Sequence, residues 1–349
     1  MRFQQDALAV ALLYGRSGTL WLGGFHTSVI LSVKKVYRAT RAALARVIAR
    51  VLPAKLMRDK RYFATWERRG YHVTPVHYYS AVPNTADLEE TLWSDPRSPI
   101  GIDMREGAQL ELLESVSTRY LGELSQFPKE APLADCPFFL NNGNFFGVDA
   151  EMLYCMVRKH RPQSIIEIGS GFSTLMSSLA IEKNKEEDPR YECKLVAIEP
   201  FPKSQLLSQC KNLSELIESP VQKVVLGRFG ELGAGDILFI DSSHVSKLGS
   251  DVNFELLEIV PRVKSGVLIH VHDVFIPFEY PRKWAIEEGW FWNEQYLLQA
   301  FLSFNSSFEI VWAGSYMHWK FPERVAAAFG PYDLTPAPPA SLWMRRVAG

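Results

Sequence analysis

The sequence predicts an α/β protein with a doubly wound, mostly parallel sheet, preceded by a mainly helical N-terminal extension. Short apolar runs alternate with helical stretches in the second half of the chain, as in parallel sheets that are covered on both faces. A glycine-rich turn joins one of these runs directly to a helix. The chain has 349 residues, of which 47% are hydrophobic, so it can bury the core of a full α/β domain and still carry an extension.

The chain is strongly basic from Lys34 to Arg61, where Asp59 is the only acid. Its apolar residues recur at helical spacing, which predicts an amphipathic helix that ends at Pro53: Val33, Tyr37, Leu44, Ile48 and Val51. Such a helix either contacts an anionic membrane surface or a partner protein, or packs on the main domain with its basic face in water. An aromatic segment over 66–80 and a helical stretch over 106–124 follow.

The most informative stretch is S-I-I-E-I-G-S-G-F-S-T at 164–174. It predicts a strand, a tight turn at Gly169 and Gly171, and a helix that opens after the turn. Glycines at such a turn let the backbone approach a ligand closely, and Ser173 or Thr174 can cap the helix.

Further strands are predicted from apolar runs along the rest of the chain: 194–200, 221–226, 236–241, 266–273, 308–314 and 341–347. The charged run at 182–189 is predicted to be a solvated loop between the first helix and the second strand. The strand over 194–200 ends at Glu199, where an acid can accept both hydroxyls of a ribose.

The glycine turn differs from a dinucleotide-binding loop in two ways. Thr174 occupies the position where a third glycine or alanine is usual, and Glu167 stands two residues before the first glycine. A carboxylate there favours an ammonium group and would repel a pyrophosphate.

The motifs E-I-G-S-G-F-S-T, I-D-S-S-H, H-V-H-D-V-F and W-N-E-Q-Y-L-L occur in this order. Together they resemble a bacterial branch of the class I S-adenosylmethionine-dependent methyltransferases, whose relatives act on sugars and small hydroxylated natural products. The resemblance implies a Rossmann-like sheet of seven strands closed by an antiparallel hairpin. It also implies a catalytic domain over 136–349, with residues 1–135 as the extension and a possible lid.

The resemblance implies a set of residues that bind S-adenosylmethionine: Glu167, Gly169, Ser170, Gly171, Ser173, Glu199 and Asp241. Glu167 and the glycines would hold its methionine part, and Glu199 its ribose.

Polar side chains also follow the strands over 236–241 and 266–273. Because ligands bind beyond the carboxyl ends of parallel strands, we expect four of these side chains to converge: Asp241, His244, His272 and Asp273. Methyl transfer to oxygen requires removal of the hydroxyl proton. A histidine can take this proton, or a divalent ion held by carboxylates can lower the hydroxyl's pKa. His244, His272 and Asp273 are therefore the predicted catalytic residues.

The arrangement further resembles metal-dependent O-methyltransferases of the catechol type, which implies a metal site formed by Asp241, His272 and Asp273. His272 departs from that pattern, because imidazole suits zinc, manganese or iron better than magnesium. Two alternatives to a metal site stay open. In the first, Asp241 lies near the cofactor and His244 or His272 acts as a base without a metal. In the second, the histidines only hydrogen-bond the loop backbone. Tyr280, Trp284 and Glu294 are predicted walls of the acceptor pocket.

The predicted function is O-methylation of a small hydroxylated or glycan-like acceptor. The alternatives are a nucleotide-sugar or dinucleotide enzyme on a similar sheet, and a non-catalytic cofactor-binding or scaffold protein. A net charge of −1 argues against general nucleic-acid binding. The start of the chain lacks the pattern of a secretory signal, so we expect a cytoplasmic protein, with peripheral attachment to the inner membrane surface through residues 34–61 as a further possibility.

Overall fold

The computed structural model describes residues 39–133, 136–329 and 338–347. Contacts within the chain define two compact units, Met1–Asn84 and Thr85–Gly349. Residues 85–135 therefore group by contact with the unit that carries the sheet. The start of the predicted basic helix, including Val33 and Tyr37, lies outside the described residues.

The described part of the first unit is mostly helical up to Glu67, and turns and irregular backbone follow to Asn84. A helix over 39–51 stops before Pro53, as the sequence predicts, because proline lacks the amide hydrogen that would continue it. It is followed by short helical segments: α3 (Ala54–Arg58), η1 (Lys60–Tyr62) and α4 (Phe63–Glu67). In neither unit do the described residues form a helix long and apolar enough to cross a bilayer.

The second unit contains a sheet of seven strands in the order β3-β2-β1-β4-β5-β7-β6. The strands are β1 (Ser164–Ile168), β2 (Lys194–Ile198), β3 (Leu213–Ile217), β4 (Ile237–Ile240), β5 (Leu268–Val271), β6 (Phe308–Ala313) and β7 (Leu342–Arg346). The first five run parallel, and β7 pairs antiparallel with both β5 and β6. The predicted Rossmann-like, seven-stranded sheet with a closing hairpin is confirmed.

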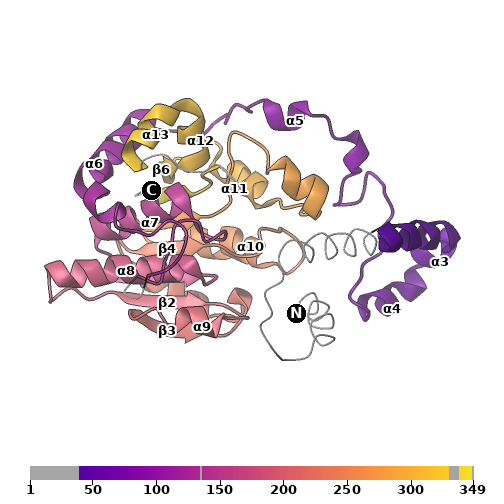
Figure 1. Ribbon diagram of the computed structural model, residues 1–349, viewed down its shortest axis with the longest axis horizontal. Coiled ribbons are helices and arrows are strands. Elements are labelled where there is room, and N and C mark those ends of the chain that lie inside the picture. The colour runs from indigo at the N-terminus through magenta and orange to yellow at the C-terminus, as the bar shows by residue number, and fades with distance from the viewer. Residues whose placement is uncertain (1–38, 134–135, 330–337, 348–349) are drawn as a thin grey trace, which may run out of the picture. The chain divides into compact units, whose positions relative to one another are not determined.

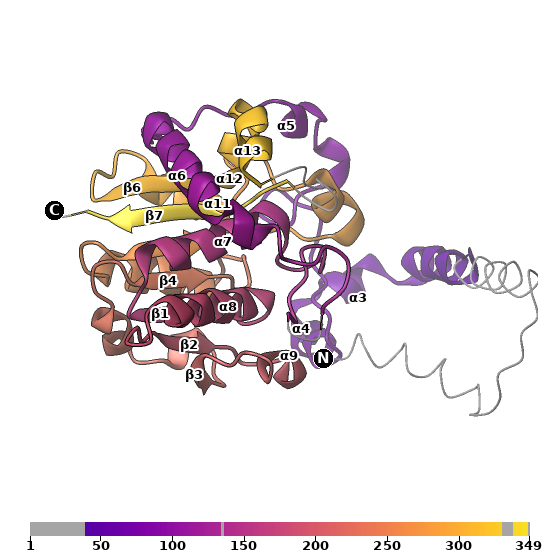
Figure 2. The ribbon, with the colours of Figure 1, turned by 60° about the vertical axis from the view of Figure 1, so that its left-hand side comes forward.

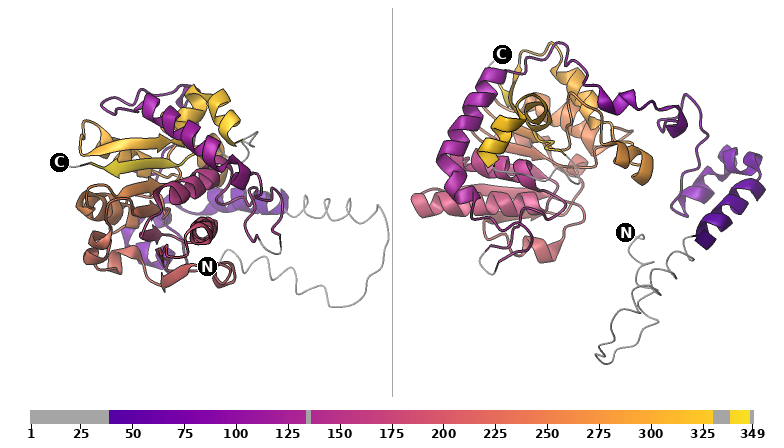
Figure 3. Two further views of the ribbon diagram at one scale, coloured as in Figure 1. Left: turned by 90° about the vertical axis from the view of Figure 1, so that its left-hand side faces the viewer. Right: turned by 45° about the horizontal axis from the view of Figure 1, so that its top comes forward.

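Helices cover both faces of this sheet (Figures 1, 2 and 3). Figure 2 shows α6, α7 and α8 in front of the strands, and α7 packs against α8. The helices of the unit are α5 (Thr91–Ser94), α6 (Glu106–Leu124), α7 (Gly147–His160), α8 (Phe172–Glu187), α9 (Ser204–Leu207), α10 (Asp251–Phe254), α11 (Glu294–Leu302), α12 (Gly314–Lys320) and α13 (Pro322–Phe329). Short turns of 3-10 or π-helix complete the unit: η2 (Thr85–Asp87), η3 (Val221–Lys223), η4 (Leu226–Glu231), η5 (Glu255–Ile259), η6 (Val260–Arg262) and η7 (Trp284–Glu288).

The prediction of a strand over 221–226 is wrong. The third strand is Leu213–Ile217, and the apolar run after it forms the 3-10 turns η3 and η4. β3 is the edge of the sheet and is only partly buried along its length. An edge strand does not need a continuous apolar sequence, so L-S-E-L-I gives a weaker signal than V-Q-K-V-V-L.

The prediction of a loop over 182–189 is also wrong for most of its length, because α8 continues to Glu187. The charges of this run form ion pairs on the helix surface. Nζ of Lys183 lies 2.8 Å from Glu186 one turn away, and Nζ of Lys211 lies 2.9 Å from Glu182. Charged pairs at helical spacing are compatible with an exposed helix end, so charge density alone did not distinguish loop from helix.

Candidate active site

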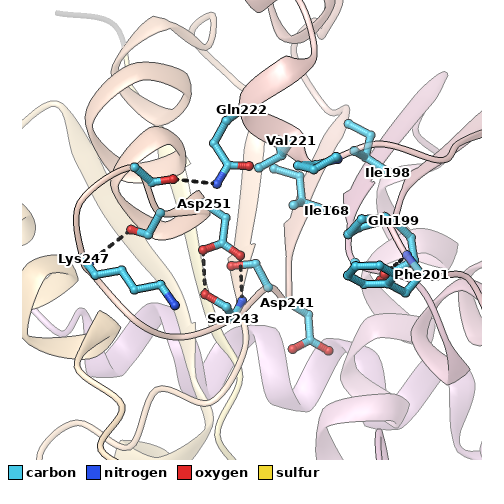
Figure 4. A pocket seen from close by; sticks show the side chains of 16 residues that line it. Ile168, Ile198, Glu199, Phe201, Val221, Gln222, Asp241, Ser243, Lys247 and Asp251 are labelled. Carbon is cyan, nitrogen blue, oxygen red and sulfur yellow. Dashed lines mark hydrogen bonds between the residues drawn. The ribbon is translucent and has the colours of Figure 1, made fainter. Parts of the chain in front are cut away.

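A cavity of about 400 Å³ lies at the carboxyl ends of β1, β2 and β4 (Figure 4). In Figure 4, Glu199 and Phe201 form one side of the cavity, and Lys247, Ser243 and Asp251 form the other. Its apolar wall comes from Ile168, Ile198 and Val221. A mainly apolar hollow with a few placed polar groups is typical of cofactor sites.

The glycine turn brings backbone to the cavity wall. Gly169 lines the cavity with φ of +98°, and a Cβ atom built there would lie 2.2 Å from the carbonyl oxygen of Asp241. Only glycine allows β1 and β4 to approach so closely at their ends. Asp241, which begins the loop after β4, also lines the cavity.

Glu167 and Ser173 lie beneath the turn, at 1% and 3% exposure. The Ser173 hydroxyl donates to Oε1 of Glu167 at 2.5 Å. Oε2 of Glu167 and Oγ of Ser170 are buried and have no hydrogen-bond partner in the described structure. Burial raises the pKa of Glu167 to about 8. Two unpaired buried polar atoms at one turn fit a site whose ligand completes them.

Glu199 lines the cavity at the end of β2, and its Oε1 accepts the backbone N–H of Phe201 at 2.8 Å. This bond fixes the carboxylate beside the cavity. The sequence analysis did not identify several other residues that line it: Phe201, Gln222, Lys247 and Asp251. Phe201 and Lys247 lie in the loops after β2 and β4, Gln222 lies in η3 after β3, and Asp251 begins α10. None of the four belongs to a recognisable motif, so sequence reasoning could not single them out.

Beyond β4 and β5, the structure brings Asp241, His244, His272 and Asp273 together. Nε2 of His244 lies 3.3 Å from Oδ1 of Asp241 and 3.4 Å from Oδ2 of Asp273. Nδ1 of His272 lies 3.6 Å and 3.5 Å from the same two oxygens. His270, one pleat back on β5, is fully buried and stacks on Phe239, so it is a core residue.

Each of the two histidines has a further carboxylate on its other nitrogen. Nδ1 of His244 hydrogen-bonds Oε2 of Glu294 at 2.9 Å, and Glu294 is 1% exposed. Nε2 of His272 lies 3.7 Å from Oδ2 of Asp149. The sequence analysis proposed Glu294 as a pocket wall and did not identify Asp149, which is far from both strands in the sequence.

Electrostatic interactions in this cluster favour charged side chains. Burial opposes the charge on His244, but the hydrogen bonds to Asp241 and Glu294 outweigh it and raise its pKa well above the usual value. Burial also opposes the charge on His272, yet the nearby Asp273 and Asp241 raise its pKa. The reverse holds for Asp241: burial would raise its pKa, and the two histidines lower it.

A second cavity of about 410 Å³ opens on the other side of the cluster. Asp149, Asp241, His272 and Asp273 form its polar end, and Trp284, Trp290 and Trp292 form an aromatic wall. The Trp290 and Trp292 rings stack with centroids 5.2 Å apart and an interplanar angle of 9°. The rings of Trp292 and His244 have centroids 4.3 Å apart.

Asp241 lines both cavities. The glycine-turn cavity and the tryptophan-walled cavity therefore meet at one carboxylate. A donor group held in the first cavity and an acceptor held in the second would face each other across this residue.

The chain shows similarity to known methyltransferases over this region. Residues 166–274, which run from β1 past the end of β5, match the family described as a methyltransferase domain. An uncharacterized protein of Archaeoglobus fulgidus is 33% identical over 168 residues, a match that covers 45% of this chain and 72% of that protein. The chain belongs to the class I S-adenosylmethionine-dependent methyltransferase family.

Solved structures of methyltransferases are also similar. The apo structure of CalS11, a TDP-rhamnose 3'-O-methyltransferase, is 14% identical with a TM-score of 0.35, over 70% of this chain and 96% of that one. The plantazolicin methyltransferase BamL is 13% identical with a TM-score of 0.31, over 70% and 97% of the two chains. The family assignment rests on the domain match and the relative, because these scores are low.

The protein is therefore a methyltransferase, and its family uses S-adenosylmethionine. The alternatives of a dinucleotide or nucleotide-sugar enzyme and of a non-catalytic scaffold are set aside. The residues at the glycine turn fit this cofactor: a backbone that only glycine allows, two unpaired buried polar atoms and a carboxylate at the end of β2.

Proposed function

We propose that this methyltransferase methylates an oxygen atom of a small hydroxylated or glycan-like acceptor. The observation that carries the proposal is the meeting of two cavities at Asp241, with His244, His272 and Asp273 beside it. A hydroxyl must lose its proton as it is methylated. The raised pKa values of His244 and His272 keep both rings protonated near neutral pH, so a carboxylate of this cluster is the group that would accept the proton while the histidines orient it.

On the cofactor side, Glu199 would accept the ribose hydroxyls, and the Gly169 backbone would lie against the ligand. Glu167, Ser170, Gly171 and Ser173 would support the methionine end from the turn. When bound, S-adenosylmethionine supplies a methyl group on a positively charged sulfur. The carboxylates of Glu199 and Asp241 suit a cationic ligand in this cavity.

On the acceptor side, the tryptophans would hold an acceptor by its apolar face. Aromatic walls exclude water and position a ring or chain without a hydrogen bond at each atom. Lys283 and Glu288 also line this cavity and would meet polar substituents. The reacting hydroxyl would then point at His272 and Asp273, which lie in the same wall.

The experiment that tests the proposal follows the methyl group. The full-length protein is incubated with S-adenosylmethionine labelled in the methyl group and with an extract of its host, and the labelled product is identified. A panel of sugars and vicinal diols, each with a matched amine, is assayed in parallel. We expect an O-methyl product. Label found only on nitrogen, sulfur or carbon would overturn the proposal.

One variant tests where the chemistry takes place. We expect His272→Ala to slow turnover and to leave cofactor affinity nearly unchanged, because His272 lines the acceptor cavity and not the cofactor cavity. A wild-type rate in this variant would remove His272 from the mechanism.

A further inference from the structure

The strap, residues 90–97, belongs to the same unit as the sheet and contains α5. None of its residues lines the cofactor cavity or the acceptor cavity. Its side chains contact the loop over 277–284, which follows β5 and ends at the first residue of η7. The last two residues of this loop, Lys283 and Trp284, line the acceptor cavity. The strap therefore contacts a segment that forms part of the cavity wall.

Two hydrogen bonds from the strap fix the backbone of the loop. The indole Nε1 of Trp93 donates to the carbonyl oxygen of Tyr280 at 3.0 Å. The backbone N–H of Arg97 donates to the carbonyl oxygen of Pro277 at 2.8 Å. Both acceptors lie in irregular backbone, where a carbonyl has no partner from a helix or strand. The strap therefore supplies the bonds that hold this part of the loop in place.

Charged groups add contacts between the same two segments. The guanidinium of Arg282 donates to both carboxylate oxygens of Glu90, with distances of 2.8, 3.0 and 3.1 Å. Its central carbon lies 5.6 Å from the centroid of the Trp93 ring, which is a cation–π distance. Nη2 of Arg97 lies 3.3 Å from Oε2 of Glu279. A single exposed ion pair adds little stability, but these contacts and the two hydrogen bonds all hold one loop.

Ring contacts connect the loop to the tryptophans of the wall. Tyr280 is 4% exposed, and its ring lies edge-to-face on Trp292 with centroids 6.1 Å apart. The Trp284 ring contacts both Trp292 and Trp290, with centroids 4.9 and 5.7 Å apart. Because closely packed rings have little free space, a shift of the loop displaces the rings that contact it. The shape of the wall therefore depends on the strap.

We propose that Glu90, Trp93 and Arg97 are positioning residues for methyl transfer. They hold the loop over 277–284 so that the tryptophan wall already has the shape that binds the acceptor. A wall ordered in advance binds more tightly, because less conformational freedom is lost on binding. The inference rests on the proposed function in taking this cavity as the acceptor site. Since the strap lines neither cavity, its loss should raise the KM for the acceptor and leave cofactor affinity unchanged.

Hydrogen exchange measured by mass spectrometry tests the positioning without any ligand. The full-length wild type is compared with Trp93→Phe, which keeps an aromatic ring but removes the N–H donor, and with Glu90→Ala. We expect amide exchange over 284–292 to become about three- to tenfold faster in Trp93→Phe, the effect of one lost hydrogen bond. In Glu90→Ala it should become about two- to fivefold faster. The strands of the sheet should exchange as in the wild type.

Glu89→Ala is the matched control, because it changes the neighbouring acid, whose carboxylate accepts from Thr91. It should exchange as the wild type does. Unchanged exchange over 284–292 in the two strap variants would overturn the inference. So would faster exchange throughout the sheet, which would mark a general loss of stability. The Glu90 side chain is 72% exposed, so Glu90→Ala decides the experiment if Trp93→Phe does not fold.

Kinetics then tests the effect on the acceptor. For the sugar or diol that gives a methylated product, KM should rise about three- to tenfold in Trp93→Phe, while kcat stays within about twofold. Calorimetry should give an unchanged affinity for S-adenosylhomocysteine. An unchanged KM with formation of an O-methyl product would overturn the inference and leave the proposed function standing. A raised KM with methylation only of nitrogen, sulfur or carbon would do the reverse.

Discussion

At the scale of single residues, Gly169 and Gly171 belong to one motif but differ in what surrounds them. A Cβ at Gly169 would lie 2.2 Å from the backbone oxygen of Asp241, and its φ of +98° is one that other residues rarely adopt. A Cβ at Gly171 would have no atom within 4 Å. The two positions therefore form a matched pair.

Gly169→Ala should destabilise the fold by about 2–4 kcal/mol, since it combines overpacking with backbone strain. Gly171→Ala should cost less than about 1 kcal/mol. Denaturant unfolding of both variants measures the difference. Equal losses would show that the contact between the ends of β1 and β4 does not restrict position 169.

The buried carboxyl of Glu167 gives a prediction about pH. Burial raises its pKa from an ordinary 4.5 to about 8, so between these values the folded state holds a proton that the unfolded chain has released. Stability must therefore fall as pH rises through this window, by about 1 kcal/mol per pH unit for one such group.

Glu167→Gln should remove this penalty, because the amide stays neutral while its oxygen still accepts from Ser173. The difference in unfolding free energy, variant minus wild type, should grow from pH 5 to pH 8 when measured by urea denaturation. A difference that does not change with pH would show that Glu167 is ionised in the folded protein across this range.

The residues also show where sequence analysis reaches its limit. Asp241, His244, His272 and Asp273 were predicted to converge because the ends of adjacent parallel strands meet at one sheet edge. Asp149 follows from no such rule, since it comes from α7 and reaches His272 only through the folded arrangement. Glu167 was predicted to meet the cofactor, yet the structure places it beneath the turn and not among the residues that line the cavity.

At the scale of elements, the central strands were predicted well and the edge was not. β1, β4 and β5 are buried along nearly all of their length and read as apolar runs. β3 lies at the edge and carries polar residues, so the stronger apolar run after it was mistaken for the strand. That run instead places Val221 in the wall of the cofactor cavity.

The helix over 39–51 gives a prediction about membranes. Its exposed apolar residues are spaced three and four apart and form one stripe: Leu44, Val47, Ile48 and Val51. Arg46 and Arg50 lie away from this stripe at helical spacing. An apolar stripe on a basic helix favours the surface of an anionic membrane.

We therefore expect the full-length protein to sediment with vesicles that contain phosphatidylglycerol, and much less with phosphatidylcholine alone. Val47→Glu should weaken binding at least about tenfold, because it removes apolar contact and adds a negative charge. Val225→Glu, at an exposed valine of the other unit, is the matched control. Equal binding to both kinds of vesicle, or an equal loss in both variants, would contradict a membrane role for the helix.

At the scale of the whole molecule, the two cavities have separate walls but share Asp241. Glu199 lines only the cofactor cavity, and Trp290 lines only the acceptor cavity. The arrangement predicts that a substitution in the wall of one cavity leaves binding in the other cavity unchanged, unless the substituted residue is Asp241.

Three variants separate these effects. Glu199→Ala should weaken binding of S-adenosylhomocysteine by about 1–3 kcal/mol, the cost of leaving polar partners unpaired, and leave the KM for the acceptor unchanged. Trp290→Ala should raise the KM for the acceptor while cofactor affinity stays the same. Asp241→Asn should weaken cofactor binding and raise the KM for the acceptor, because one carboxylate serves both cavities. Calorimetry measures the cofactor affinity, and initial rates measure the KM for the acceptor. If Asp241→Asn altered only one of them, the carboxylate would belong to a single cavity, and donor and acceptor would have to meet elsewhere along the sheet edge.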